Sequence, residues 1–155
     1  MRDAAVAPSM AHVFTIDVAL QPPIVLTEAS AGRRVFIPIV GGTVNGPRLR
    51  AEIIPGGGDR AVERPGDVMD IHARYLIRTH DDVVIEVDNR GHWREVPGGA
   101  PYFVTAPVFS TDDDRYRWLT RGVFVGMAHE VDETRIVIDV YEVEPAADSA
   151  AEGGS

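Results

Sequence analysis

Hydrophobic and polar residues alternate along most of this 155-residue chain. In the segment HVFTIDVAL (12–20), for example, Phe14, Ile16, Val18 and Leu20 fall on one face. A period of two is typical of a β-strand that buries one face and exposes the other. The pattern recurs and predicts nine strands, over residues 12–20, 33–40, 48–54, 60–64, 68–79, 83–90, 102–109, 122–130 and 134–143.

The segments between these strands are rich in Gly, Pro, Asn and Asp, which are typical of turns. The most glycine-rich is PGGGDRAVERPGD (55–67), and we interpret its PGGG as a tight reversal that needs positive φ angles. The segment TDDDRYRWL (111–119) is expected to form one short helical turn, because acidic residues favour a helix N-terminus.

Many strands with short connections predict an all-β fold of one domain. We expect a single antiparallel meander, closed or nearly closed into a small barrel of about 8–9 strands, as in lipocalins and other calycins. Closure removes exposed strand edges, which favours it over the alternative of a two-sheet sandwich. The barrel is expected to span residues 11–144, and the small, polar ends 1–10 and 145–155 are expected to be disordered.

Composition removes several classes of function. The chain has no Cys and no Lys, which excludes thiol nucleophiles, Cys-ligated metals, Schiff bases and a P-loop. Its net charge of -9 argues against nucleic acid as a partner. No stretch has the roughly 18 apolar residues of a membrane-spanning helix, and no signal peptide is recognisable. We therefore expect a cytoplasmic protein that binds no membrane and uses no metal and no cofactor.

Two polar residues share the apolar face of a predicted strand. Asn89 continues the face formed by Ile85 and Val87, and Tyr75 that formed by Ile71 and other apolar residues. A buried Asn must be hydrogen-bonded or lie beside ligand or water, so Asn89 is either a strand-end cap or a ligand-binding residue. Tyr75 is either a core residue or a catalytic group that donates a hydrogen bond to a developing oxyanion.

Asp59 is the best candidate for a catalytic acid or base. It follows the PGGG segment, and burial at the mouth of a barrel would raise the pKa of its carboxyl group. The alternative is that the carboxylate braces a turn by accepting nearby backbone N–H groups.

Strand direction, followed through the predicted reversals, places 55–59 and 110–121 at the same end of the barrel. Trp118 and Tyr116 could there stack on a flat ligand near Asp59, although Trp118 could equally plug the end of the barrel. Arg33 at this end, and Tyr102 at the other, are further candidate ligand-binding residues.

Five segments stand in the order and spacing of a known family: AGRRVFIPIVGGTVNGPRLRAEIIPGGGDR, DIHARYLIRT, DNRG, RYRWLTRGVFVG and IVIDVYEV. On these segments the chain, over roughly residues 12–143, resembles the family called domain of unknown function 3237. The resemblance implies a small all-β barrel with no generally assigned activity. Three residues depart from the family pattern: Arg60 replaces an aromatic residue, His72 an Asp and Thr120 an Asn. If these positions line a site, the ligand or chemistry of this protein can differ from that of its relatives.

Three functions fit this picture. The first is a cofactor-independent isomerase, cyclase or lyase that acts by general acid–base chemistry on a small apolar or aromatic carbonyl compound. The second is a non-catalytic, lipocalin-like protein that binds a hydrophobic small molecule. The third is a structural module whose outer sheet face forms a homo-oligomer, most simply a homodimer. A cavity with a polar group in its wall would favour the enzyme, and a filled interior the structural module.

Overall fold

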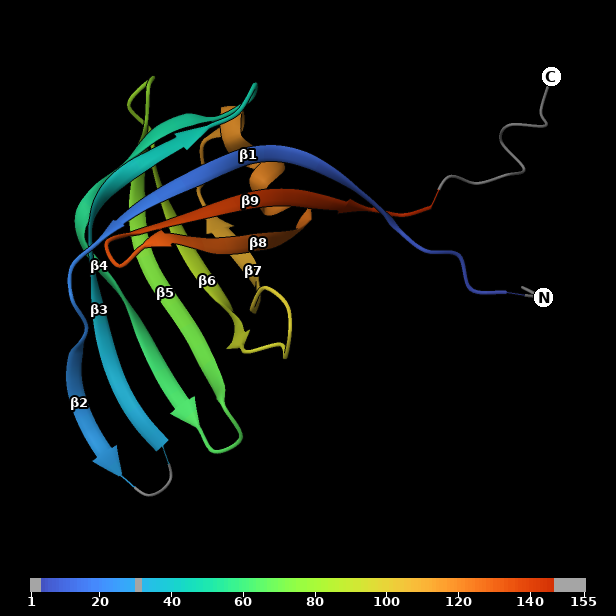
Figure 1. The fold of residues 1–155 in the computed structure, drawn as a ribbon. Coiled ribbons are helices and arrows are strands. Elements are labelled where there is room, and N and C mark those ends of the chain that lie inside the picture. The colour runs from blue at the N-terminus through green and yellow to red at the C-terminus, as the bar shows by residue number, and fades with distance from the viewer. Residues whose placement is uncertain (1–3, 30–31, 147–155) are drawn as a thin grey trace.

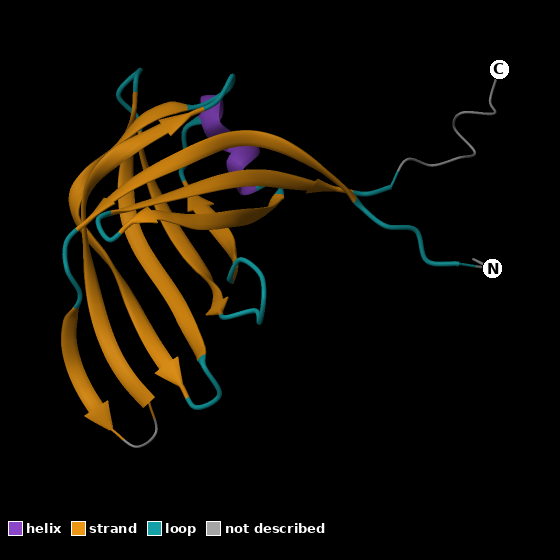
Figure 2. Ribbon diagram, in the orientation of Figure 1, coloured by secondary structure: helices purple, strands orange, loops and turns teal. Residues whose placement is uncertain are grey.

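The computed structural model describes residues 4–29 and 32–146, and this part of the chain is all-β with one short helix (Figures 1 and 2). The predicted fold class is therefore confirmed. The predicted disordered ends lie partly outside the described residues, and β1 begins at Ser9. The elements are β1 (Ser9–Leu20), β2 (Ile24–Ala29), β3 (Gly32–Asn45), β4 (Arg50–Arg64), β5 (Val68–Thr79), β6 (Val84–Arg94), β7 (Tyr102–Ser110), the 3₁₀ helix η1 (Asp114–Thr120), β8 (Val123–Asp132) and β9 (Arg135–Glu144).

Eight of the described strands close into an antiparallel barrel. From β3 to β9 each strand pairs with the next, β9 pairs with β1, and β1 pairs with β3. Among the described strands, β2 is an extra one that pairs only with β3. It runs in the direction of β1 but is separated from it by Pro22 and Pro23, which have no N–H to donate to a neighbouring strand. The predicted closed meander is confirmed.

The PGGG segment is not a reversal. Residues Arg50–Arg64 form one strand, so the predicted strands 48–54 and 60–64 are joined, and the turn predicted at 55–59 is wrong. The predicted and observed numbers of strands agree only because a strand was missed at Ile24–Ala29. Residues 24–28 are all exposed, and their sequence IVLTE begins with three consecutive apolar residues. It therefore lacks the alternation of apolar and polar residues on which the strand predictions depend.

The glycines of this segment belong to a bulge in β4. Ile54 is paired with Leu76 and Gly58 with Arg74, so four steps along β4 match two along β5. Gly56 has a φ of 120°, a backbone conformation that residues with a Cβ rarely adopt. The backbone freedom seen in the sequence therefore serves to bend a continuous strand.

The connections gather at two ends of the barrel (Figure 1). We call the end that carries η1 and the turns 46–49 and 80–83 the helix end. The opposite end, which carries the turns 65–67 and 95–101, is called the far end. Asp59 lies within β4 rather than at a turn, so the predicted grouping of 55–59 with 110–121 at one end is wrong.

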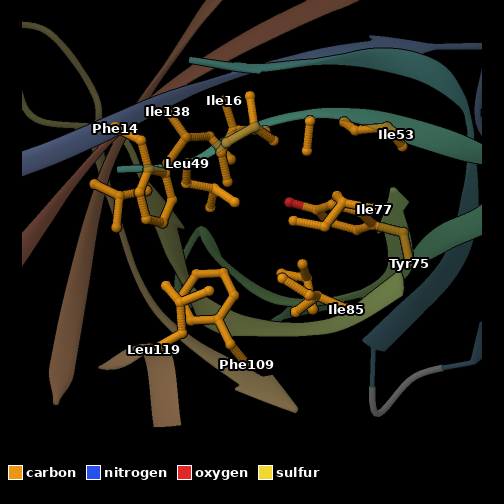
Figure 3. Close-up of a cluster of buried hydrophobic side chains, with 14 of the residues drawn as sticks. Phe14, Ile16, Leu49, Ile53, Tyr75, Ile77, Ile85, Phe109, Leu119 and Ile138 are labelled. Carbon is orange, nitrogen blue, oxygen red and sulfur yellow. The ribbon is translucent and has the colours of Figure 1, made fainter. Parts of the chain in front are cut away.

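A hydrophobic core fills the helix half of the interior. The rings of Phe14, Phe109 and Phe124 contact one another with centroids 5.4 to 6.5 Å apart, and Leu119 of η1 is 1% exposed. Figure 3 shows Phe109 and Leu119 among the side chains of this cluster. Within the described residues, no helix is long and apolar enough to cross a membrane.

Candidate functional site

The far half of the barrel interior contains a narrow cavity. Its volume is about 40 Å³. That is room for a few water molecules. Seven strands contribute to the wall, through Val18, Leu20, Ile37, Ile39, Asp59, Ile71, Ala73, Tyr75, Asn89, Phe103, Thr105, Ile136 and Ile138.

Four of these thirteen residues are polar: Asp59, Tyr75, Asn89 and Thr105. Asp59 of β4 and Asn89 of β6 are both paired with Ala73 of β5, and Tyr75 lies two residues further along β5. Because alternate residues of a strand point to the same face, these side chains share one region of the inner wall. The structure thus brings together three predicted site residues from three different strands.

Three polar atoms in this wall have no hydrogen-bond partner among the described residues. They are the Tyr75 hydroxyl, Asn89 Oδ1 and Thr105 Oγ1, in side chains that are only 2 to 4% exposed. Leaving such a group unsatisfied costs about 1–3 kcal/mol, so buried polar atoms of this kind typically face a ligand or ordered water. Figure 3 shows the Tyr75 phenol directed into the barrel interior.

Burial sets the protonation of the two titratable groups in the wall. It raises the pKa of Tyr75 above its ordinary value, which keeps the phenol a neutral hydrogen-bond donor. Burial also raises the pKa of Asp59 from 3.8 to about 6. Two smaller effects oppose this rise: the backbone N–H of His72 donates to Asp59 Oδ1 at 2.9 Å, and the charge of His72 favours the carboxylate.

Asp59 combines the two alternatives that the sequence left open. Its carboxylate accepts a backbone N–H, as a brace does, but the donor belongs to the neighbouring strand and not to a turn. The side chain also lines the cavity. It lies two residues before the buried Ala61 on β4 and therefore on the same, inward face of the strand. A carboxyl group held on one oxygen and facing an apolar cavity can accept or donate a proton there.

Thr105 is a cavity residue that the sequence analysis missed. The sequence pattern could have identified it. Thr105 lies two residues from Phe103 and four from Phe109, so it is a polar residue on the apolar face of its strand. Two glycines leave room for it. A Cβ on Gly126 would lie 2.5 Å from Thr105 Oγ1, and a Cβ on Gly91 would collide with the backbone around Thr105.

Tyr116 and Trp118 lie at the helix end, away from the cavity. Tyr116 is buried and donates a hydrogen bond of 2.5 Å to Asp81 Oδ1. Trp118 packs against the ring of Phe14, with the Arg48 guanidinium 4.0 Å above its own ring. These contacts match the alternative in which Trp118 plugs the barrel, and the structure does not bring either residue to Asp59.

Arg33 and Tyr102 are at the far end but do not line the cavity. Arg33 forms ion pairs with Glu63 at 3.3 Å and Glu28 at 3.6 Å. Tyr102 is 39% exposed, and the Arg94 guanidinium lies 4.4 Å above its ring. Both contacts involve groups at the surface, so neither residue is placed to hold a ligand inside the barrel.

Trp93 was not among the predicted site residues but lies beside the cavity. It is paired with the wall residue Phe103 and packs, partly buried, against the cluster that contains Ile71. Its ring therefore lies at the far end of the barrel, next to the cavity wall. In the part of the chain that the structure describes, no group of three His, Asp or Glu residues is placed to hold a metal ion.

Comparison with known proteins places this barrel among relatives of unknown function. A family model described as "Protein of unknown function (DUF3237)" matches residues 8–143. A UPF0311 protein from Bradyrhizobium diazoefficiens is 34% identical, over 85% of this chain and 94% of that protein. The crystal structure of a conserved protein of unknown function from Rhodopseudomonas palustris is 32% identical, with a TM-score of 0.82, over 90% of this chain and 99% of that one.

A more distant structure shares the fold. It is described as an enzyme from Penicillium herquei, and it covers 93% of this chain and 100% of its own with a TM-score of 0.76. The sequence identity is 20%, so the likeness shows the fold alone.

Proposed function

This chain belongs to the protein family of unknown function DUF3237, and we propose that it is an enzyme that transfers protons on a small apolar or aromatic carbonyl compound. The reaction would be an isomerisation, cyclisation or elimination that uses only the protein's own acid–base groups. One observation carries the proposal: Asp59, with a raised pKa, shares an apolar cavity with three unpartnered polar atoms.

Asp59 is the proposed acid–base group. A carboxyl group with a pKa of about 6 is mostly ionised at neutral pH but still holds a proton well enough to return it. The carboxylate would take a proton from a carbon next to the carbonyl group or from a hydroxyl group of the substrate. The same residue would then deliver the proton to another atom of the substrate.

Tyr75 and Asn89 are proposed to form hydrogen bonds with oxygen atoms of the substrate. Proton removal next to a carbonyl group builds negative charge on the carbonyl oxygen, and a buried donor stabilises this charge more than water does. The phenol of Tyr75 can donate to this oxygen, and the unpartnered Asn89 Oδ1 can accept a hydrogen bond from a hydroxyl group of the substrate. Both residues are almost fully buried. The nine apolar wall residues would exclude water and hold the carbon skeleton.

Deuterium exchange tests this proposal without knowledge of the natural substrate. A panel of cyclic enones and hydroxyaryl ketones is incubated with the protein in D₂O, and NMR follows deuterium uptake next to the carbonyl group. We expect uptake with wild type and its loss in Asp59→Asn, which keeps the side-chain volume. Tyr75→Phe should slow uptake by roughly 10²–10³-fold, as for other oxyanion donors. Equal rates in wild type and Asp59→Asn would refute the role of Asp59.

The second candidate function is a non-catalytic binding protein, which is favoured by the narrow and mainly apolar wall. Such a protein would bind members of the same panel, with a rise in melting temperature, but would exchange none of them. Binding would then survive in Asp59→Asn. The two candidates therefore differ in whether the loss of one carboxyl group abolishes exchange or leaves binding as it was.

A further inference from the structure

The pairing of β4 with β5 is interrupted next to Asp59. In the pairing of β4 with β5, Asp59 is matched with Ala73 and Val62 with Asp70, but no pair joins Arg60 to His72. The backbone N–H of His72 instead donates to the Asp59 side chain, across 2.9 Å. A backbone N–H of β5 thus donates to a carboxylate that lines the cavity and not to a backbone carbonyl group of β4.

The side chain of His72 is on the other side of the same wall. It neighbours Ala73, which faces inward with Asp59, so the imidazole faces outward. Its Nε2 atom is buried and lies 3.2 Å from Asp88 Oδ1, an ion-pair distance, but makes no hydrogen bond among the described residues. The imidazole therefore lies next to the Asp88 carboxylate, on the outer face of the wall whose inner face carries Asp59.

Other charges surround this pair on the outer face. Asp88 of β6 also contacts Arg74 of β5 at 3.7 Å and Arg90 of β6 at 3.3 Å. Asp70 of β5 is paired instead with Arg64 and with His92, and Arg60 of β4 lies over the ring of Phe36. Among the described charged groups, Asp88 is the acid in contact with the His72 imidazole.

We propose that His72 is a positioning residue for Asp59: its N–H orients the carboxylate, and its imidazole, which lies next to Asp88, places a charge near that carboxylate through the barrel wall. The His72 charge is one of the causes that lower the pKa of Asp59, against the larger effect of burial. His72 and Asp88 would thus adjust the pH at which Asp59 changes from acid to base, although neither side chain lies in the cavity. The consequence for turnover rests on the proposed function, but the titration of Asp59 does not.

The test is a carboxyl ¹³C NMR titration of the protein, with the Asp59 signal assigned by its loss in Asp59→Asn. His72→Gln keeps the backbone N–H and removes the charge. We expect the Asp59 titration midpoint to move upward by roughly half a pH unit, less than a direct ion pair gives because the imidazole is partly exposed. His72→Arg, with a permanent charge, should hold the midpoint at or below the wild-type value.

Two comparisons make the result specific. His92→Gln removes an imidazole from the same outer face, where it is paired with Asp70, and should leave the Asp59 midpoint where it is. In an Asp88→Asn background, His72→Gln should have a smaller effect than in wild type, because the ion-pair partner of the imidazole is gone. An unchanged midpoint in His72→Gln, or an equal shift in His92→Gln, would overturn the proposal.

The outcome is separable from the proposed function. A shifted midpoint in a protein that exchanges no carbonyl compound would establish the positioning role and refute the enzyme. If deuterium exchange depends on Asp59 but the Asp59 titration midpoint is the same in His72→Gln as in wild type, only the positioning role is refuted. If both hold, the pH dependence of exchange moves with the midpoint in each variant.

Discussion

Asp59 and Asn89 flank Ala73 on the inner wall of the barrel, because each is paired with it from a neighbouring strand. Neighbouring strands are about 4.8 Å apart, so the backbones of these two residues are separated by roughly 10 Å. A ligand that lies against Ala73 can therefore contact both the carboxyl group and the amide.

The raised pKa of Asp59 predicts how stability depends on pH. Because the folded-state pKa of about 6 exceeds the ordinary 3.8, the folded protein binds this proton more tightly than the unfolded chain does. The resulting stabilisation is present below pH 3.8 and is lost as the pH rises through 6. Asp59→Asn should accordingly be more stable than wild type near pH 8, by up to about 3 kcal/mol, and similar near pH 4. Urea unfolding at both pH values measures this difference.

Asp17→Asn is the matched control, and its effect should have the opposite sign. The hydrogen bond from Arg135 lowers the pKa of Asp17, so the stabilisation is present above the ordinary pKa and is lost as the pH falls. Asp17→Asn should be less stable than wild type at neutral pH. If Asp59→Asn and Asp17→Asn shift stability in the same direction, the burial of Asp59 does not have the effect described.

Thr105→Val tests whether the unpartnered hydroxyl has a cost. The substitution keeps the shape and removes a buried polar atom without a partner, so stability should be unchanged or higher by about 1 kcal/mol. Thr79→Val is the control, because Thr79 donates to Asp81 Oδ1 at 2.6 Å and accepts the Val83 N–H at 2.8 Å. It should lose stability. Equal losses in both variants would mean that Thr105 has a partner in solution.

The two tryptophans predict which end of the barrel takes a ligand. Trp93 stands beside the cavity and Trp118 packs at the helix end, and the chain has no others. Binding of a naphthol probe should quench fluorescence in Trp118→Phe, where Trp93 remains, and leave it nearly unchanged in Trp93→Phe. The reverse pattern would place the ligand at the helix end.

Tyr116→Phe tests the role of the helix end. The substitution removes the hydrogen bond to Asp81, which together with that from Thr79 lowers the pKa of Asp81 to about 2. The melting temperature should fall by a few degrees at neutral pH, where the carboxylate is charged, and deuterium exchange should be unaffected. A loss of exchange at full stability would instead make Tyr116 part of the site.

Much of the fold could be predicted from local pattern. The alternation along 68–79 and 83–90 correctly assigned Tyr75 and Asn89 to the inner face, because the side-chain period of a strand is a local property. The same criterion applied to 102–109 would have found Thr105. The cytoplasmic location and the homodimer stay predictions.

The PGGG segment shows where local pattern fails. Glycines permit a turn and a bulge equally well, and the choice between them depends on which residues of β5 lie opposite. The error propagated, because a wrong reversal exchanges the two ends of the barrel for every strand that follows. Tyr116 and Trp118 were for this reason grouped with Asp59.

The sequence by itself determined that the chain is an antiparallel barrel and which face of most strands is buried, since both follow from a period of two and short connections. Only the tertiary structure decided that the aromatic residues near η1 fill one end, that a cavity remains toward the other, and that Asp59, Tyr75, Asn89 and Thr105 share its wall. Those outcomes depend on register, and register is set by pairing between residues distant in the chain.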